Sequence, residues 1–316
     1  MRIESLNPPR FSLGMRFGVF TAVFYLASHS YAAAESPVNL INAEAREGKI
    51  VVTPVRGSIS MLSGSGGNIA VLHGPQGKLM VDGGITLSQQ PLQAALDKLG
   101  PGKPKYVINT HWHWDHADSN GWLHDLGATI IAHPNSLKHM SQSVRVEDWQ
   151  HTFEPVPLKS RPSSLVSDSR TIEFAGEMVL LTHYGLAHTD GDLYAYFEKG
   201  DVLATGDTYW NGVYPFIDSV AGGSIDGMIR AAETNIARST GNTIVIPGHG
   251  ALAKRADLIE YRDMLVEIRR NVADLKREGR TLDQVIAARP TAKFDPKWGN
   301  FVINPAFFTR LVYRGV

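Results

Sequence analysis

The chain has 316 residues, with 31 Lys or Arg and 31 Asp or Glu, so its formal net charge is zero. This balance argues against a nucleic-acid partner, because proteins that bind nucleic acids usually carry a basic excess. The chain contains no cysteine, which excludes disulfides and any metal site held by thiolate. The length is sufficient for one large domain or two small ones.

The first 34 residues have the pattern of an export signal. Three arginines (Arg2, Arg10 and Arg16) precede an apolar run at residues 17–27, and Ala32–Ala34 offers small residues for cleavage. The run is too short to span a bilayer in the mature protein. We predict a signal peptide over residues 1–34, cleaved near Ala34, and a periplasmic or secreted product. An uncleaved anchor and cleavage after Ala32 are the alternatives.

After the leader, Gly-rich turns separate short apolar runs, and then strands alternate with helical patterns. Strands are expected at residues 50–55, 59–62, 68–72, 78–81, 106–108 and 128–132. Helices are expected at residues 88–99, at about 118–126 and from about 135. This order indicates an α/β fold with helices covering a sheet. The Pro- and Ser-rich residues 146–169 are expected to form a long surface excursion or lid without compact structure of their own.

The strand at 106–108 leads directly into His111-Trp112-His113-Trp114-Asp115-His116. Along an extended backbone, alternate side chains point to one side, so His111 and His113 can bind one metal ion together. Asp115 and His116 follow a turn and can face a second ion. Imidazole and carboxylate without thiolate suit zinc and also accept iron or manganese. Asp82, at the end of the 78–81 strand, is a candidate to orient a metal-bound histidine, or simply a turn residue.

The second half places three more residues of ligand type where strands end. Strands are expected at residues 171–174, 178–182, 193–197, 202–204 and 243–246, and a helix at about 225–237. His188 lies between two of these strands, Asp207 follows the 202–204 strand, and His249 follows the last in Pro-Gly-His-Gly. Amphipathic helices are expected at 255–278 and 281–288, and the tail around Phe307 either packs on the domain or buries itself in a dimer partner.

The motif His-x-His-x-Asp-His, followed by a distant His, an Asp in Gly-Asp and a His in Pro-Gly-His-Gly, resembles the metallo-β-lactamase superfamily from about residue 50 to 253. The resemblance implies a four-layer αβ/βα sandwich over residues 35–316, with C-terminal helices from about 254. It also implies two metal ions. The first would be held by His111, His113 and His188, the second by Asp115, His116 and His249, with Asp207 bridging both.

This ligand set departs from that of typical β-lactamases of the family. Subclasses that use Cys have it near the position of Asp207, and the all-His subclass lacks the bridging Asp. Asp207 therefore makes the site similar to the glyoxalase II, lactonase and broad-hydrolase branches, although no glutathione-binding tail is evident after Asp257.

Two ions sharing a water would lower its pKa from about 15.7 towards roughly 7. The prediction is a dinuclear zinc hydrolase that cleaves an ester, lactone, thioester or amide, including β-lactams, by a metal-bound hydroxide. Asp115 is the candidate to move the proton. Aromatic residues near the motif are candidates to line the substrate groove, or to pack in the core: Trp112, Tyr209, Trp210 and Tyr214.

Two alternatives from other classes remain. One is a mononuclear iron oxidoreductase similar to the persulfide dioxygenases of this superfamily, which use fewer of the same ligands. The other is a non-catalytic metal-binding accessory protein. A small-molecule substrate is expected, with no nucleic acid and, after removal of the signal, no membrane as partner. The sequence does not determine the oligomeric state.

Overall fold

A computed structural model describes residues 36–316, so the predicted signal peptide lies outside the described residues. Residues 36–316 contain a seven-stranded sheet in the order β1-β2-β3-β4-β5-β6-β9. The strands are β1 (Val51–Arg56), β2 (Ile59–Ser63), β3 (Ile69–Gly74), β4 (Gly77–Val81), β5 (Pro104–Ile108), β6 (Thr129–Ala132) and β9 (Ser164–Leu165). Strands β1 to β4 form an antiparallel meander, and β4, β5 and β6 run parallel.

A second sheet has six strands in the order β10-β11-β12-β13-β14-β15. They are β10 (Ser169–Phe174), β11 (Glu177–His183), β12 (Leu193–Phe197), β13 (Val202–Ala204), β14 (Ile244–Ile246) and β15 (Ala253–Lys254). Only β13 and β14 pair in parallel, because helix α6 (Ile225–Arg238) connects them and such a crossover returns the chain in the same direction.

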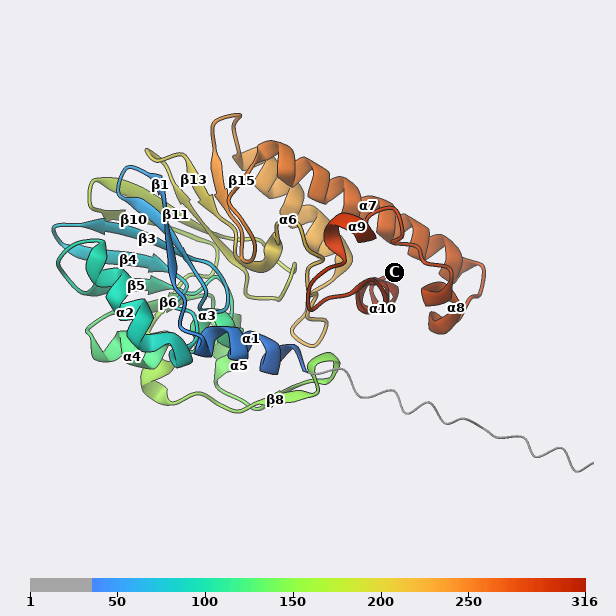
Figure 1. Ribbon diagram of the computed structural model, residues 1–316, viewed down its shortest axis with the longest axis horizontal. Coiled ribbons are helices and arrows are strands. Elements are labelled where there is room, and N and C mark those ends of the chain that lie inside the picture. The colour runs from blue at the N-terminus through green and yellow to red at the C-terminus, as the bar shows by residue number, and fades with distance from the viewer. Residues whose placement is uncertain (1–35) are drawn as a thin grey trace, which may run out of the picture. The chain divides into compact units, whose positions relative to one another are not determined.

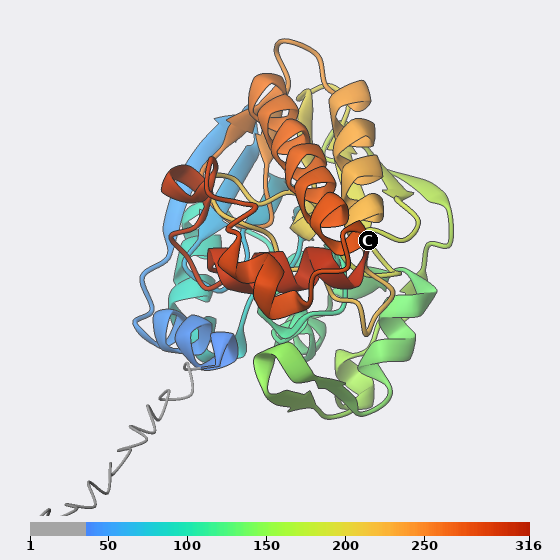
Figure 2. The same cartoon turned by 90° about the vertical axis from the view of Figure 1, so that its right-hand side faces the viewer.

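The two sheets pack face to face, with helices on both outer sides (Figure 1). Apolar side chains from both sheets share one buried cluster that includes Leu79, Ile108 and Phe197. The outer face of the first sheet packs against α2 (Gln89–Lys98) and α4 (Asn120–Asp125). The outer face of the second packs against α6 and α7 (Arg255–Arg277), which run side by side (Figure 2). The predicted four-layer αβ/βα sandwich is confirmed.

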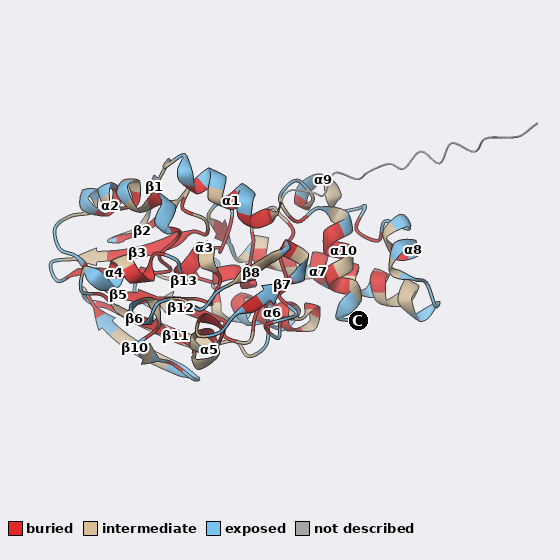
Figure 3. Ribbon diagram, turned by 90° about the horizontal axis from the view of Figure 1, so that it is seen from below, coloured by how far each residue is buried: buried red, intermediate tan, exposed pale blue. Residues whose placement is uncertain are grey.

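The helices after residue 254 extend the layer formed by α6 and α7. Helix α10 (Pro305–Arg314) packs against α7 and α8 (Leu282–Ala287), with α9 (Asp295–Trp298) preceding it. Phe308 in α10 is fully buried, so within the described residues the tail packs on its own domain. Figure 3 shows buried residues on the facing sides of these helices. No helix in residues 36–316 has the length and apolar character that crossing a membrane requires.

The prediction that residues 146–169 lack compact structure is wrong. Strands β7 (Val144–Val146) and β8 (His151–Phe153) form a hairpin that follows helix α5 (Pro134–Met140), and β9 joins the edge of the first sheet beside β6. Trp149 at the hairpin turn is buried and packs against Phe216 with ring centroids 4.4 Å apart. This aromatic contact, formed across distant parts of the chain, outweighs the Pro- and Ser-rich local composition.

Candidate metal centre

The predicted ligands come together at the ends of strands from both sheets. His111 and His113 follow β5, and α3 (Trp114–Ala117) carries Asp115 and His116. From the second sheet, His188 lies in the loop between β11 and β12, Asp207 follows β13 and His249 follows β14. The parallel strands of the first sheet end at one edge, as do β13 and β14 of the second, and the face-to-face packing of the sheets brings the two edges together. Residues separated by more than a hundred positions therefore meet in one place.

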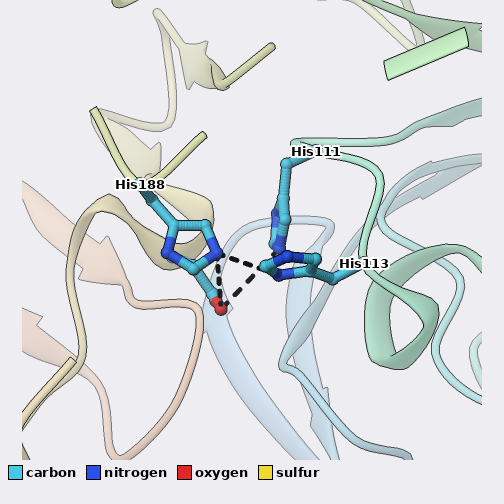
Figure 4. A group of neighbouring side chains, drawn as sticks. His111, His113 and His188 are labelled. Carbon is cyan, nitrogen blue, oxygen red and sulfur yellow. Dashed lines mark hydrogen bonds and ion pairs between the residues drawn. The ribbon is translucent and has the colours of Figure 1, made fainter. Parts of the chain in front are cut away.

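The first group of residues consists of His111, His113, His188 and Asp207. One atom from each lies within 4.8 Å of the others, and all four residues are buried. The three imidazole rings point towards one another (Figure 4). His188 Nε2 lies 3.0 Å from His113 Nδ1, and Asp207 Oδ2 lies 3.6 Å from His188 Nε2 and 3.7 Å from His111 Nε2.

The second group consists of Asp115, His116 and His249, again with one atom from each within 4.8 Å. His249 Nε2 lies 3.3 Å from Asp115 Oδ2. The other oxygen of Asp207, Oδ1, lies 3.0 Å from His116 Nε2 and 3.5 Å from His249 Nε2. The Asp207 carboxylate thus faces the first group with one oxygen and the second group with the other, as expected of a bridging residue.

Asp82 orients histidines of both groups. It accepts a hydrogen bond from His116 Nδ1 at 2.8 Å and another from Thr110 Oγ1 at 2.9 Å. Thr110 Oγ1 in turn accepts from His111 Nδ1 at 3.0 Å. The backbone φ of Asp82 is +68°, a conformation that Asp tolerates better than most residues. These bonds point Nε2 of His111 and of His116 inwards, which favours the orienting role for Asp82 over that of a simple turn residue.

Asp218 is a residue that the sequence reasoning missed. It accepts a hydrogen bond from His113 Nε2 at 2.9 Å, which leaves Nδ1 as the inward nitrogen of that ring. His188 Nδ1 similarly donates to the carbonyl of Phe216 at 2.9 Å. The facing nitrogens of His113 and His188 are therefore both bare lone pairs, which repel each other unless a cation lies between them. No local motif around Asp218 distinguishes it from an ordinary loop aspartate.

The two groups differ in their electrostatics. In the second group, burial alone would lower the pKa values of His116 and His249, but Asp207 and Asp115 outweigh it, raising the pKa of His116 well above its usual range and that of His249 to about 9; these two rings must lose a proton to bind a metal. Burial lowers the pKa of His111 well below its usual range and lowers the pKa values of His113 and His188, and neutral imidazole is the form that binds metals. Burial alone would raise the pKa of Asp207, but His116 and His249 outweigh it and hold that pKa well below its usual range. The Asp207 carboxylate is consequently ionised.

Buried atoms without partners test whether these residues fit a metal. Within residues 36–316, no hydrogen-bond partner reaches His111 Nε2, His116 Nε2, His249 Nε2 or Asp207 Oδ1. Each such buried atom costs about 1–3 kcal/mol if it stays unsatisfied. They are four of twelve such side-chain atoms in the described residues, and the other eight lie outside the two groups. Nitrogen and oxygen donors gathered in this way suit zinc, iron or manganese. The residues therefore fit divalent metal ions.

Two glycines leave room for the predicted ligands. A Cβ on Gly67 would lie 2.2 Å from Cε1 of His116, and one on Gly248 would lie 2.0 Å from Oδ1 of Asp207. Both distances are far below van der Waals contact, so only glycine allows the backbone to approach the site this closely. Residues 64–67, expected to form a turn, thus also bring the β2–β3 connection against His116.

The aromatic residues around the site differ in whether they border a cavity or pack inside the protein. Trp112 and Trp114 line a cavity of about 360 Å³ between the motif, α1 (Pro37–Arg46) and β8, whereas Trp210 packs beside His249 with ring centroids 4.3 Å apart. Of the two alternatives predicted for Tyr209 and Tyr214, the structure favours packing in the core over lining the substrate groove. Both are fully buried; Tyr209 packs on Tyr261 of α7, and Tyr214 stacks on Phe308 of α10.

Comparison with known proteins places these observations in a family. The sequence model of the metallo-beta-lactamase superfamily matches residues 62–271, a range that includes every predicted metal ligand. No curated protein matches the chain. Many solved structures do, and those described below are less than 20% identical, so they show the fold alone.

Three solved structures illustrate this likeness. The DIM-1 metallo-beta-lactamase is 18% identical, with a TM-score of 0.55, over 69% of this chain and 97% of that chain. A metallo-beta-lactamase from Pontibacter korlensis is 15% identical, with a TM-score of 0.55, over 69% and 99%. The inverting sec-alkylsulfatase Pisa1 from Pseudomonas sp. is 15% identical, with a TM-score of 0.63, over 84% and 50%. With the fold, the site and the family match in agreement, the chain belongs to the metallo-beta-lactamase superfamily.

Proposed function

We propose that this protein is a dinuclear zinc hydrolase that cleaves an ester, lactone, thioester or amide bond. One observation carries the proposal: the two oxygens of Asp207 face two separate groups of buried ligand residues, at 3.0–3.7 Å from their nitrogens. His111, His113 and His188 would hold one ion, Asp115, His116 and His249 the other, and Asp207 both. Bound there, a pair of divalent cations would polarise the scissile carbonyl and lower the pKa of a water towards roughly 7.

Asp115 is positioned to move the proton. Burial alone would raise its pKa, but His116 and His249 outweigh it and hold that pKa below its usual range, so the group is a carboxylate at neutral pH. A carboxylate can accept a proton from the attacking water and release it to the leaving group. The remaining residues position the groups that do this: Asp82 holds the rings of His111 and His116, and Asp218 holds that of His113.

The test combines metal analysis with a substrate panel on the full chain loaded with zinc. We expect two zinc ions per chain and turnover of at least one ester, lactone, thioester or β-lactam. One iron per chain with oxygen uptake would instead identify an oxidoreductase. Metal binding without turnover of any substrate in a broad panel would favour a non-catalytic accessory protein.

Substitution of Asp115 tests the assignment of the proton-transfer residue. We expect Asp115→Ala to lower kcat about 10²- to 10⁴-fold, the usual contribution of a general base, while circular dichroism stays unchanged. Asp125→Ala, which removes an exposed carboxylate of α4 paired only with Lys159, is the matched control and should retain full activity. Unchanged turnover in the Asp115 variant would refute this assignment.

A further inference from the structure

A cavity of about 480 Å³ opens directly onto the second group of ligand residues at His249. Its walls come from α1, β2, the connection between β2 and β3, and three segments of the C-terminal half, around residues 213, 249–251 and 301. The side chains that matter here are Glu44, Met61, Val213 and Phe301. Phe301 lies beside His249 and Trp210, with ring centroids 6.5 and 6.2 Å apart. A substrate that reaches the metal centre from this side must contact these residues.

The charge of this cavity is unusual for a site that would receive an anion. Of its lining residues, Glu44 is the only one besides His249 that carries an ionisable group, and none is Lys or Arg. Glu44 is exposed, and within residues 36–316 no cation pairs with it at salt-bridge distance. The cavity on the other side of the motif, lined by Trp112 and Trp114, also has no Lys or Arg in its wall.

The metal ions themselves would attract anions. Two divalent cations held by the carboxylates of Asp115 and Asp207 would leave a net positive charge. Any selection against anionic substrates must therefore be made by the side chains that line the cavity. A substrate carboxylate or sulfate away from the scissile bond would meet no cationic partner there and would be repelled by Glu44. An apolar group would instead be covered by Met61, Val213 and Phe301, and its burial contributes about 25 cal/mol per Å² of apolar surface.

We propose that the substrate is an uncharged ester or lactone with an apolar acyl group that packs against Phe301, and that Glu44 selects against anionic substrates. This inference rests on the proposed hydrolase function and narrows its substrate class. It disfavours β-lactams, whose carboxylate lies away from the scissile amide, and other substrates that carry a negative charge outside the scissile group.

The test uses two esters that differ in one group: 4-nitrophenyl butanoate, and 4-nitrophenyl hydrogen succinate, in which a carboxylate replaces the terminal methyl. We expect the zinc-loaded full chain to have the higher kcat/KM for the butanoate. At low salt, Glu44→Gln should lower this preference about threefold and Glu44→Lys about tenfold, because exposed charges interact weakly in water. The differences should shrink as salt shortens the Debye length from about 30 Å at 0.01 M to about 3 Å at 1 M.

Glu47→Lys is the matched control, since Glu47 is an exposed glutamate at the end of the same helix that does not line the cavity. This substitution makes the same charge change as Glu44→Lys. It should leave the preference for the butanoate over the succinate within about twofold of the wild-type value. A wild-type preference for the succinate, or equal effects of Glu44→Lys and Glu47→Lys, would overturn the inference. Phe301→Ala should lower kcat/KM for the butanoate more than for the succinate; equal losses would contradict the role of Phe301.

A binding measurement separates failure of this inference from failure of the proposed function. N-phenylbutanamide and N-phenylsuccinamic acid form the corresponding neutral and anionic pair, and their binding to the zinc-loaded chain can be followed by tryptophan fluorescence, since Trp210 lies beside His249 and Phe301. Tighter binding of the neutral anilide, weakened selectively by Glu44→Lys, would support the substrate class even if no ester is cleaved. Tighter binding of the acid would overturn it whether or not esters are cleaved.

Discussion

The two groups of ligand residues differ in how firmly the protein holds them. In the first group, each imidazole is fixed by a hydrogen bond on its outer nitrogen: His111 by Thr110, His113 by Asp218 and His188 by the Phe216 carbonyl. All three rings are fully buried. In the second group, Asp82 fixes the outer nitrogen of His116 in the same way, and that ring is also fully buried. His249 is the exception: it is 7% exposed, borders the larger cavity, and its side chain makes its described polar contacts only inwards, to Asp115 and Asp207.

This difference indicates that the two groups have different roles. In the first group every ring has one nitrogen bound to the protein and one left for a metal, whereas in the second group this holds for His116 but not for His249. The second group faces the cavity from which a substrate would come, and it includes Asp115, the proposed proton carrier. Asp207 joins them. A single substitution should therefore weaken metal binding in one group or in both, depending on which group the substituted residue belongs to or supports.

The largest effect is expected at Asp207, because both groups depend on it. Asp207→Ala removes one oxygen from each group and leaves the facing histidines without their shared carboxylate. We expect loss of metal from both groups and a fall in kcat/KM of about 10³-fold or more, which corresponds to several kcal/mol of lost stabilisation. Metal content by mass spectrometry and turnover provide the measurement. Asp226→Ala, at an exposed ion pair of α6 with Arg269, is the control and should keep both metals.

The next effect is confined to the second group. The methyl group of Gly67→Ala would have to displace His116, whose Cε1 would otherwise lie 2.2 Å from the new Cβ. Overpacking of this kind costs about 1–3 kcal/mol, and we expect the loss of one metal ion and a lower unfolding midpoint. Gly241→Ala, where nothing lies within 4 Å of the added Cβ, should change neither quantity. Retention of both metals in the Gly67 variant would show that His116 does not bind one.

A smaller effect should separate the first group from the second in a metal titration. Asp218→Asn weakens only the support of His113. If two zinc ions bind in sequence, we expect about tenfold weaker binding of one of them. Asp82→Asn weakens the support of His116 and, through Thr110, of His111, so both steps should weaken. Stepwise zinc titration by calorimetry distinguishes these outcomes. Identical profiles for the two variants would argue against two separately supported ions.

The smallest effect is expected outside both groups. Tyr209 is fully buried, and its hydroxyl has no hydrogen-bond partner within the described residues. Tyr209→Phe removes this unsatisfied group, so we expect kcat/KM to stay within about twofold and stability to be equal or up to about 1 kcal/mol higher. Denaturant unfolding and steady-state kinetics provide the test. A large loss of turnover would restore Tyr209 as a substrate-binding residue.

Much of the fold and most of the candidate site could be predicted because their signals are local. The alternation of strands and helices is encoded in short apolar runs and turn residues, and the His111–His116 motif falls within six positions of one strand end. The position of Asp82 at the end of β4, and of His249 at the end of β14, required only that strand ends be recognised.

Other features depended on contacts between distant segments, which no local pattern encodes. Asp218 lies 105 positions from His113, and the direction in which Tyr209 and Tyr214 point was decided by the packing of α7 and α10. The acidic, lysine- and arginine-free character of the cavity at His249 likewise arises only where α1 meets the C-terminal half. By itself, the sequence determined which chemical groups stand at strand ends; the tertiary structure decided which of them face each other, because that depends on the path of the whole chain.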